Sequence, residues 1–367
     1  YPEWRWTPYH QYHVDNFFVC DPASGTFQEL KDLIDGLHAA GIAVILDVAP
    51  NHMSDKCGRQ GNSGADDKYY TSTRDGNWWG SASGNPQTHP YPFDSLDRFH
   101  LNGTIQNWDT SPENLQGQFK GTDDLMQEDS TTSDILYQAF KNLIDATDCD
   151  GFRVDAIKHI PYDWCRTWAQ AMRDHAAWRG KSNFLVFGEL FSYDHSSLAS
   201  WCNDAYGFNS SLDFPLMQAM NNAFGMGYSG YQLGEEMGYI SSKYGKAAQN
   251  VIAFLDNHDV NRFAYAYGGS TKENAVRIMK PAMTFLYLAP PIPLLYYGTE
   301  HAFNQGGHGN GSNKTADESS DYYNPDDSDW QRECMFDPDQ TWGAAGFQPG
   351  NAYGNMFSDD AKSAGLY

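Results

Sequence analysis

The chain repeats a helical apolar pattern followed by a short continuous apolar run. Residues 26–41 begin with a capping box formed by Thr26 and Glu29, carry apolar side chains at helical spacing and stop at Gly41, which predicts a helix. The apolar run 42–47 follows at once and is typical of a parallel strand covered on both faces. Together the two patterns predict a helix that leads directly into a buried strand.

The same unit recurs further along the chain. Helical patterns around Leu136, Trp168 and Met279 each precede a strand-like run. Alternation of helices with strands favours a parallel α/β fold over a sandwich or a helical bundle. The six predicted strands cover residues 42–47, 151–155, 184–188, 211–214, 251–256 and 292–297.

Polar residues stand where several of these strands end, in the segments 47–52, 153–155, 188–189 and 256–259. Barrel enzymes keep their chemistry at the carboxyl ends of their strands, so we expect a TIM (β/α)8-type barrel. An open doubly wound sheet is the alternative. Such a sheet usually carries a Gly-rich turn, and no GxGxxG follows a strand here.

The spacing of the predicted helices and strands indicates the domain boundaries of the chain. About eighty residues rich in Gly, Asn, Asp, Ser and Trp separate the first strand from the next helix, too many for an ordinary connection. We therefore expect residues 1–52 and 125–303 to form two parts of a catalytic barrel, with residues 53–124 as an inserted loop domain. Residues 304–367 have little apolar content and are predicted to be a flexible excursion and tail.

Composition narrows the range of partners. The formal net charge of -23 repels phosphate backbones and anionic lipid, so no nucleic acid is expected. No apolar stretch reaches the roughly 20 residues that cross a bilayer, so no membrane span is expected. Neutral, hydroxyl-rich ligands and divalent cations remain, and 11 Trp with 23 Tyr supply flat faces on which sugars stack.

The cysteines and the glycosylation sequons indicate whether the protein is secreted. Six cysteines without CxxC spacing disfavour a zinc ribbon or redox motif but allow two or three disulfides. With four Asn-x-Ser/Thr sequons and the acidic composition, they favour a secreted, extracellular protein. No signal peptide is visible and Tyr1 is not a natural start, so we expect a piece of a longer precursor. The cysteines are Cys20, Cys57, Cys149, Cys165, Cys202 and Cys334.

The strand ends carry candidate chemistry. Alternation within a strand points Arg153 and Asp155 to the same side, where the guanidinium keeps the carboxylate ionised. Taken singly, such a pair is equally a buried ion pair, and His52 or His258 is more often structural. Acids and histidines at four strand ends together indicate a pocket, and a pair of carboxylates with hydroxyl-binding donors is what glycoside hydrolysis needs.

Four of these segments carry a family resemblance. Residues 47–52, 151–159, 187–189 and 254–259 resemble, in order and spacing, the signature segments of the alpha-amylase family of retaining glycosidases. The likeness runs from about residue 9 to residue 300. It implies a barrel truncated at both ends, because the family's first two strands and its final helix have no counterpart here. The inserted domain would then follow the third barrel strand.

The resemblance implies roles for particular residues. Asp155 would be the nucleophile, Glu189 the general acid/base and Asp259 the transition-state stabiliser, with Arg153 orienting Asp155. Residues 9–12 resemble the family's aromatic turn, although Gln11 and His13 depart from its pattern. The substrate-binding residues implied by the resemblance are Tyr12, His52, Arg153, Lys158, His159 and His258.

The resemblance also implies a calcium ion that ties the loop domain to the barrel. The matching ligands would be the Asn51 side chain, the Asp124 carboxylate and the His159 backbone carbonyl, oxygen donors that suit a hard cation. Asp123 is the alternative to Asp124 if the alignment shifts by one residue.

Within the family, the sequence favours hydrolysis over transfer. The family's transferases carry an aromatic residue four positions before the calcium aspartate, where Lys120 stands here with Phe119 beside it. We expect a monomeric, endo-acting retaining hydrolase of alpha-1,4-glucans such as starch or glycogen. A cyclodextrin glucanotransferase is the alternative, and a glucan-binding protein without turnover is disfavoured because Asp155, Glu189 and Asp259 are all present.

Overall fold

The computed structural model of the chain describes residues 12–22, 24–59, 69, 78–80, 89–119, 122–202, 207–268 and 272–303. The predicted tail 304–367 lies outside these residues. The chain divides into two compact units. The first unit comprises Tyr1–Phe191 and Asp204–Ser211, and the second comprises Ser192–Asn203 and Leu212–Tyr367.

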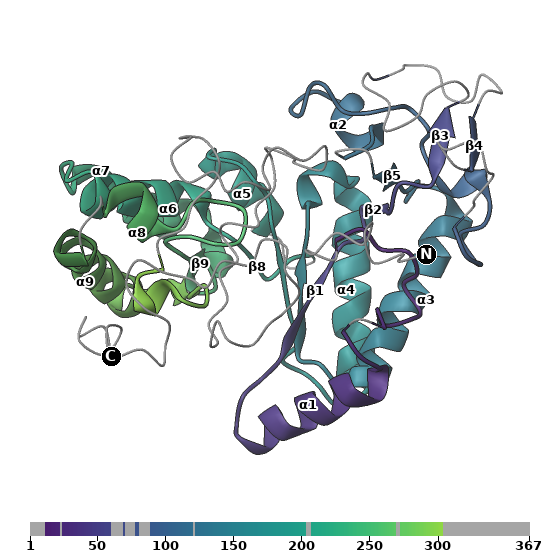
Figure 1. Cartoon of the computed structure of the whole chain (residues 1–367), viewed down its shortest axis with the longest axis horizontal. Coiled ribbons are helices and arrows are strands. Elements are labelled where there is room, and N and C mark those ends of the chain that lie inside the picture. The colour runs from purple at the N-terminus through teal and green to yellow at the C-terminus, as the bar shows by residue number, and fades with distance from the viewer. Residues whose placement is uncertain are drawn as a thin grey trace, which may run out of the picture. The chain divides into compact units, whose positions relative to one another are not determined.

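A four-stranded parallel sheet organises the first unit (Figure 1). The strand order is β1-β6-β7-β8, and the register places Arg153 between Asp47 and Phe187. All four residues of β6 are buried, as expected for a strand covered on both faces. The strands are β1 (Ile45–Val48), β6 (Gly151–Val154), β7 (Leu185–Gly188) and β8 (Ser210–Ser211).

Three long helices accompany this sheet, with α3 packed beside both α1 and α4. The capping box predicted for α1 is present: the Glu29 amide donates to Thr26 Oγ1 (3.2 Å) and the Thr26 amide donates to Glu29 Oε2 (2.8 Å). The helix ends just before Gly41, whose positive φ of 78° suits glycine. The helices are α1 (Phe27–Ala39), α3 (Ser130–Thr147) and α4 (Tyr162–Trp178).

Aromatic side chains form the core between the sheet and its helices. Phe152 of β6 lies 5.1 Å from Phe184, 6.0 Å from Phe140 and 6.0 Å from Trp168, centroid to centroid. All four side chains are buried. Edge-to-face and offset contacts of this kind add to the free energy gained by burying apolar area, and they fix the sheet against α3 and α4.

Two small antiparallel pairs and a few short turns lie in the segment between β1 and α3. The pairing of β2 with β5 brings together the two ends of the predicted insertion 53–124, so the chain leaves and returns at one place. These elements are β2 (His52–Met53), β3 (Cys57–Arg59), β4 (Trp78–Gly80), β5 (Asp123–Asp124), η2 (Leu96–Arg98) and α2 (Glu113–Gln116).

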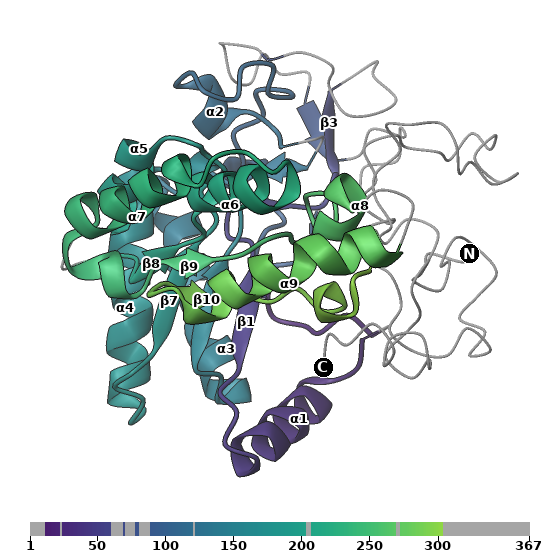
Figure 2. The ribbon, with the colours of Figure 1, turned by 90° about the vertical axis from the view of Figure 1, so that its left-hand side faces the viewer.

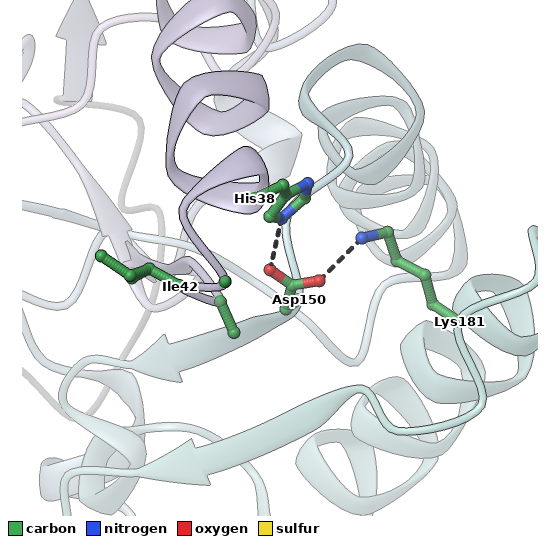
Figure 3. A pocket seen from close by; sticks show the side chains of 6 residues that line it. His38, Ile42, Asp150 and Lys181 are labelled. Atoms are coloured by element: carbon green, nitrogen blue, oxygen red, sulfur yellow. Dashed lines mark hydrogen bonds and ion pairs between the residues drawn. The ribbon is translucent and has the colours of Figure 1, made fainter.

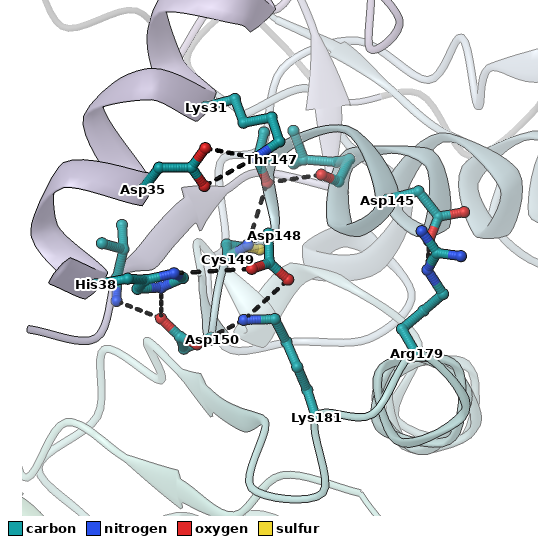
Figure 4. A network of polar contacts seen from close by, with 12 residues as sticks. Lys31, Asp35, His38, Asp145, Thr147, Asp148, Cys149, Asp150, Arg179 and Lys181 are labelled. Carbon is teal, nitrogen blue, oxygen red and sulfur yellow. Dashed lines mark hydrogen bonds and ion pairs between the residues drawn. The ribbon is translucent and has the colours of Figure 1, made fainter. Parts of the chain in front are cut away.

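A network of charges lies at the amino-terminal edge of the sheet, around a depression of about 270 Å³ (Figures 3 and 4). Asp150, which directly precedes β6, accepts hydrogen bonds from His38 Nε2, the Val44 amide and Lys181 Nζ, each at 2.7 Å. Burial works to raise the pKa of Asp150, but these donors outweigh it and lower that pKa. The ionised carboxylate therefore ties α1 to the strand edge.

The described residues of the second unit are mainly helical and contain one parallel strand pair, β9 with β10 (Figure 2). Helix α6 packs on α7 and α8 packs on α9. The elements are α5 (His195–Cys202), α6 (Phe214–Met220), η4 (Asn221–Gly225), α7 (Tyr231–Lys243), η5 (Gly245–Gln249), β9 (Ile252–Ala253), α8 (Phe263–Tyr267), α9 (Lys272–Leu288), β10 (Ile292–Pro293) and η6 (Thr299–His301).

Each of the six predicted strands has a counterpart, but the last ones are shorter than predicted. Strand pairing there is limited to Ile252–Ala253 with Ile292–Pro293. Beyond this pair, Asp256 accepts hydrogen bonds from the Phe263 amide (2.8 Å) and Thr299 Oγ1 (2.6 Å) and does not continue the strand. The described residues contain no closed barrel. Within them β1 has a strand partner on one side only, and the predicted barrel is not completed.

The expectation of disulfides finds no support among the described cysteines. Those five are all free thiols, and Cys334 lies outside the described residues. Four of them are buried in separate elements, in β3, before β6, in α4 and in α5. Across the residues that the structure describes, no helix has the length and apolarity needed to cross a bilayer.

Two glycines give opposite predictions for stability. A Cβ at Gly151 would collide with the Leu185 carbonyl oxygen across the β6–β7 pair, whereas one at Gly36 on α1 would meet nothing within 4 Å. Gly151→Ala should lower the free energy of unfolding by about 1–3 kcal/mol. Gly36→Ala should raise it by about 0.5–1 kcal/mol through helix propensity. Denaturant unfolding measures both, and equal shifts in the two variants would contradict this description of the sheet.

Candidate active site

One arginine at the carboxyl end of β6 contacts three carboxylates. Arg153 Nη1 donates to Asp155 Oδ1 (2.7 Å) and to Asp47 Oδ1 (2.9 Å), and its Nη2 forms an ion pair with Glu189 Oε2 (3.0 Å). The three acids come from or directly follow the neighbouring strands β1, β6 and β7. The sheet therefore gathers Asp155 and Glu189 on a single guanidinium.

The backbone holds these side chains firmly. The Asp155 amide donates to Val48 O (2.8 Å) and the Glu189 amide to Val154 O (2.8 Å), so the ladder extends past the strand ends. Ala156 has a positive φ of 51°, and its amide donates to Glu189 Oε2 (3.4 Å). A residue other than glycine in this conformation costs of order 1–3 kcal/mol and is typical of functional sites.

Burial gives this cluster its electrostatic character. Arg153, Asp155 and Glu189 are only 7%, 8% and 7% exposed. Burial alone would lower the pKa of Arg153, but Glu189, Asp47 and Asp155 together raise it well above its usual value. The guanidinium is permanently charged and orients the carboxylates around it.

Tyr12 and His52 join the same cluster. The Tyr12 hydroxyl donates to Asp47 Oδ2 (2.8 Å) and accepts from Arg153 Nη1 (3.4 Å), while His52 Nε2 contacts the Tyr12 carbonyl oxygen at 3.2 Å. Burial is the main cause that raises the pKa of Tyr12, so it stays a neutral phenol that can donate. Tyr12, the predicted platform residue, thus lies beside Arg153 and Asp47.

Aromatic rings form a wall next to His52. Phe119 stacks on His52 at 5.6 Å and lies 5.3 Å from both His159 and Trp108, between ring centroids. Burial lowers the pKa of His159 to about 4, so its neutral ring donates through Nδ1 to Asn114 O (2.8 Å). Lys158, beside it, forms an ion pair with Asp109 at 2.6 Å.

Two buried oxygens fit a cation. Asn51 Oδ1 and Asp124 Oδ1 are both buried without a hydrogen-bond partner. Asn51 directly precedes β2 and Asp124 lies on β5. The two strands align His52 with Asp124, and the Leu125 amide donates to Asn51 O (3.0 Å). Burial, the largest cause, raises the pKa of Asp124 to about 7 even though His100 contacts its Oδ2 at 2.7 Å. An added positive charge would relieve this penalty.

Asp123, the alternative to Asp124, is engaged elsewhere. Its Oδ2 accepts from the amides of Lys56 and Cys57, both at 2.8 Å, and contacts His89 Nε2 at 2.7 Å. The unpartnered oxygen therefore belongs to Asp124. This geometry favours Asp124 over Asp123 as the partner of Asn51.

The remaining predicted residues lie in the second unit. Asn257 Oδ1 accepts from the Asp259 amide (2.8 Å) and from the Val260 amide (3.0 Å), which shapes the turn after β9. His258 Nε2 forms an ion pair with Asp259 Oδ2 at 3.0 Å. The placement of Asp259 and His258 next to Asp155 stays a prediction.

Sequence reasoning missed several residues of this site. Asp47 belongs to the family-like segment 47–52, but the sequence assigns it no role. Its hydrogen bond with Arg153 follows from the strand register that places the two residues side by side. Trp108, Asp109 and His100 carried no motif, so nothing in the sequence distinguished them. At Gly188, which ends β7, an added Cβ would collide with the Ile157 side chain. That space is filled by protein.

Comparisons with known proteins identify the family. The family model described as "Alpha amylase, catalytic domain" matches residues 4–362. A beta/alpha-amylase of Paenibacillus polymyxa is 29% identical over 304 residues, covering 81% of this chain and 22% of that protein. A cyclomaltodextrin glucanotransferase of Bacillus licheniformis is also 29% identical over 304 residues, covering 80% of this chain and 38% of that protein.

A solved structure is also similar to this chain. The alpha-amylase of Geobacillus thermoleovorans, in complex with acarbose, has a TM-score of 0.64 and 29% identity over 81% of this chain and 58% of that one. This chain thus spans well under two thirds of the length of these relatives. The family and its solved structures imply a TIM barrel. Since the family model spans nearly all of its residues, the chain belongs to the alpha-amylase family, matching its catalytic domain.

Proposed function

We propose that this chain is the catalytic part of an endo-acting, retaining hydrolase of alpha-1,4-glucosidic bonds. The observation that carries the proposal is the pair Asp155 and Glu189, buried on one guanidinium at the carboxyl ends of neighbouring parallel strands. Two carboxylates held close together suit double displacement, for which a separation of roughly 5 to 5.5 Å is typical.

In this mechanism the two acids act in turn. Asp155 attacks the anomeric carbon while Glu189 gives its proton to the leaving oxygen, which forms a covalent glycosyl-enzyme. Glu189 then takes a proton from water, whose oxygen displaces Asp155 and leaves the anomeric configuration retained. Arg153 holds both carboxylates at their positions throughout, and Tyr12 donates to Asp47 at the edge of the cluster.

The surrounding residues would bind the sugar. We propose that His52 and His258 donate to hydroxyl groups at the cleavage point and that Asp259 stabilises the positive charge that develops there. Tyr12 offers an aromatic face, and Lys158 with His159 would contact the sugar on the leaving-group side. Together these residues supply the donors and the flat surface that a glucan chain requires.

A calcium ion would stabilise this arrangement. Asn51 Oδ1 and Asp124 Oδ1 are the unpartnered oxygens that would hold it, with the His159 carbonyl as a further ligand. The ion would supply positive charge that links the segment 53–124 to the strands, and it would take no part in bond cleavage.

Transfer to a sugar acceptor is the second candidate, because relatives of both kinds match this chain at similar identity, an alpha-amylase at 27% and a cyclomaltodextrin glucanotransferase at 29%. Lys120, at the position that favours hydrolysis, lies outside the described residues. Phe119 beside it is half-buried, and its ring is already engaged by stacking on His52 and by an edge contact with Trp108, so we assign it to the wall beside His52 and not to an acceptor platform. Hydrolysis is therefore the function that we propose, with secretion as an accompanying prediction.

Glu189→Gln should lower kcat on starch by about 10²–10⁴-fold, because the amide cannot donate a proton to the leaving oxygen. The kcat/KM for a glucosyl fluoride, which reports only the first displacement, should fall much less than the kcat/KM for starch, since fluoride leaves without a proton. Glu235→Gln, the same change on the exposed face of α7, is the matched control and should leave both rates unchanged. Equal losses of kcat/KM on both substrates would remove Glu189 from the acid role.

Calcium added back to chelator-treated protein should raise Tm by several degrees, since a ligand at 100 times its Kd contributes about 2.7 kcal/mol. Asp124→Asn should abolish most of this rise. Asp94→Asn, an exposed aspartate in the same segment, should keep it. A melting temperature that ignores calcium in the unaltered protein would refute the site.

A further inference from the structure

Three potential metal ligands meet inside the first unit, outside the site already described. Cys57, His89 and Asp123 offer a sulfur, a ring nitrogen and a carboxylate oxygen that all lie within 4.8 Å of one another. The three residues are only 2%, 1% and 1% exposed. Such a group is shielded from solvent and combines three kinds of donor.

The backbone places these residues rigidly. Cys57 opens β3 and Asp123 lies on β5, and the Lys56 and Cys57 amides both donate to Asp123 Oδ2 at 2.8 Å. The His89 ring stacks on buried Phe99 with 4.9 Å between centroids. A preorganised set of donors of this kind needs little rearrangement to accept an ion.

Two orphaned polar atoms at the cluster point independently to a missing ligand. His89 Nδ1 is buried without a hydrogen-bond partner, although Nε2 contacts Asp123. Gln118 is 2% exposed, its Nε2 lies 3.4 Å from Asp123 Oδ1, and its Oε1 is buried without a partner. A half turn of the Gln118 amide would place Oε1 beside the carboxylate, where a cation between the two oxygens would satisfy both.

The chemistry of the donors selects the ion. Calcium takes oxygen ligands, whereas a thiolate with an imidazole and a carboxylate suits zinc in tetrahedral coordination. One thiolate and one carboxylate also neutralise a dication, so the loaded site would bury no net charge. A neutral assembly is the form in which several charged groups are least costly to remove from water.

Strand geometry separates this cluster from the calcium ligands. Successive residues of a strand point to opposite faces, and Asp123 turns toward His89 while Asp124 turns toward His100. The two neighbouring aspartates of β5 therefore serve different sites, one with oxygen donors and the other with mixed donors.

We propose that Cys57, His89 and Asp123 bind a structural zinc ion, with Gln118 Oε1 as the fourth ligand. The ion joins β3, β5 and the segment at His89, and so links distant parts of the stretch between β2 and α3. The proposal does not depend on the glycosidase function, because none of the four ligands is assigned to substrate or to the reaction.

Zinc content and cobalt spectroscopy test this proposal on the tag-free chain. Dialysis against zinc with excess calcium should leave one zinc per chain. Replacement by Co²⁺ should give the strong d–d bands of tetrahedral cobalt and a thiolate-to-cobalt charge-transfer band in the near ultraviolet. Cys57→Ser should lose the charge-transfer band and most of the bound zinc. Cys20→Ser, which changes a half-exposed cysteine away from the cluster, is the matched control and should keep both.

Three outcomes would overturn the proposal: folded chain that retains no zinc, zinc that calcium displaces, and a charge-transfer band that survives in Cys57→Ser. If Cys57→Ser does not fold, the cobalt spectrum of the unaltered chain and of His89→Gln decides. A thiolate band that weakens in His89→Gln supports the site, and a spectrum without thiolate ligation in the unaltered chain rejects it.

Discussion

The buried guanidinium of Arg153 is the interaction on which the rest of the first unit depends. A charge so little exposed is costly unless carboxylates surround it, and three of them do, from three neighbouring strands. A shift of one residue in the register would turn Arg153 to the other face of the sheet and leave those acids without their partner. The same contacts that fix the register also fix Asp155 and Glu189 at the sheet's carboxyl edge, so stability and chemistry rest on one geometry.

The opposite edge of the sheet is secured by a second set of charges. There Asp150 binds His38, Lys181 and the chain between α1 and β1, far from any predicted substrate (Figure 4). The two edges of the sheet carry charged groups with different roles. Ion pairs at the amino-terminal edge can be optimised for stability alone, whereas Ala156 at the carboxyl edge keeps a strained backbone that brings its amide toward Glu189.

The segment between β2 and α3 shows what a short strand can organise. With two residues, β5 presents Asp123 to one face and Asp124 to the other, and each carboxylate meets a buried histidine. Nearby, Phe119 stacks on His52, so the conformation of this segment bears directly on the wall of the candidate active site. Cations held at either aspartate would therefore influence that wall through the strand and not through contact with substrate.

The sequence by itself determined the helix and strand order, the capping box at Thr26, the family and the strand ends that carry Arg153, Asp155 and Glu189. It could do so because periodicity, caps and short motifs are local properties of the chain. Only the tertiary structure decided that Asp47 shares Arg153, that Ile157 fills the space beside Gly188, and that Cys57, His89 and Asp123 meet. Contacts between residues tens of positions apart depend on strand register and on how loops return, and no local pattern encodes either.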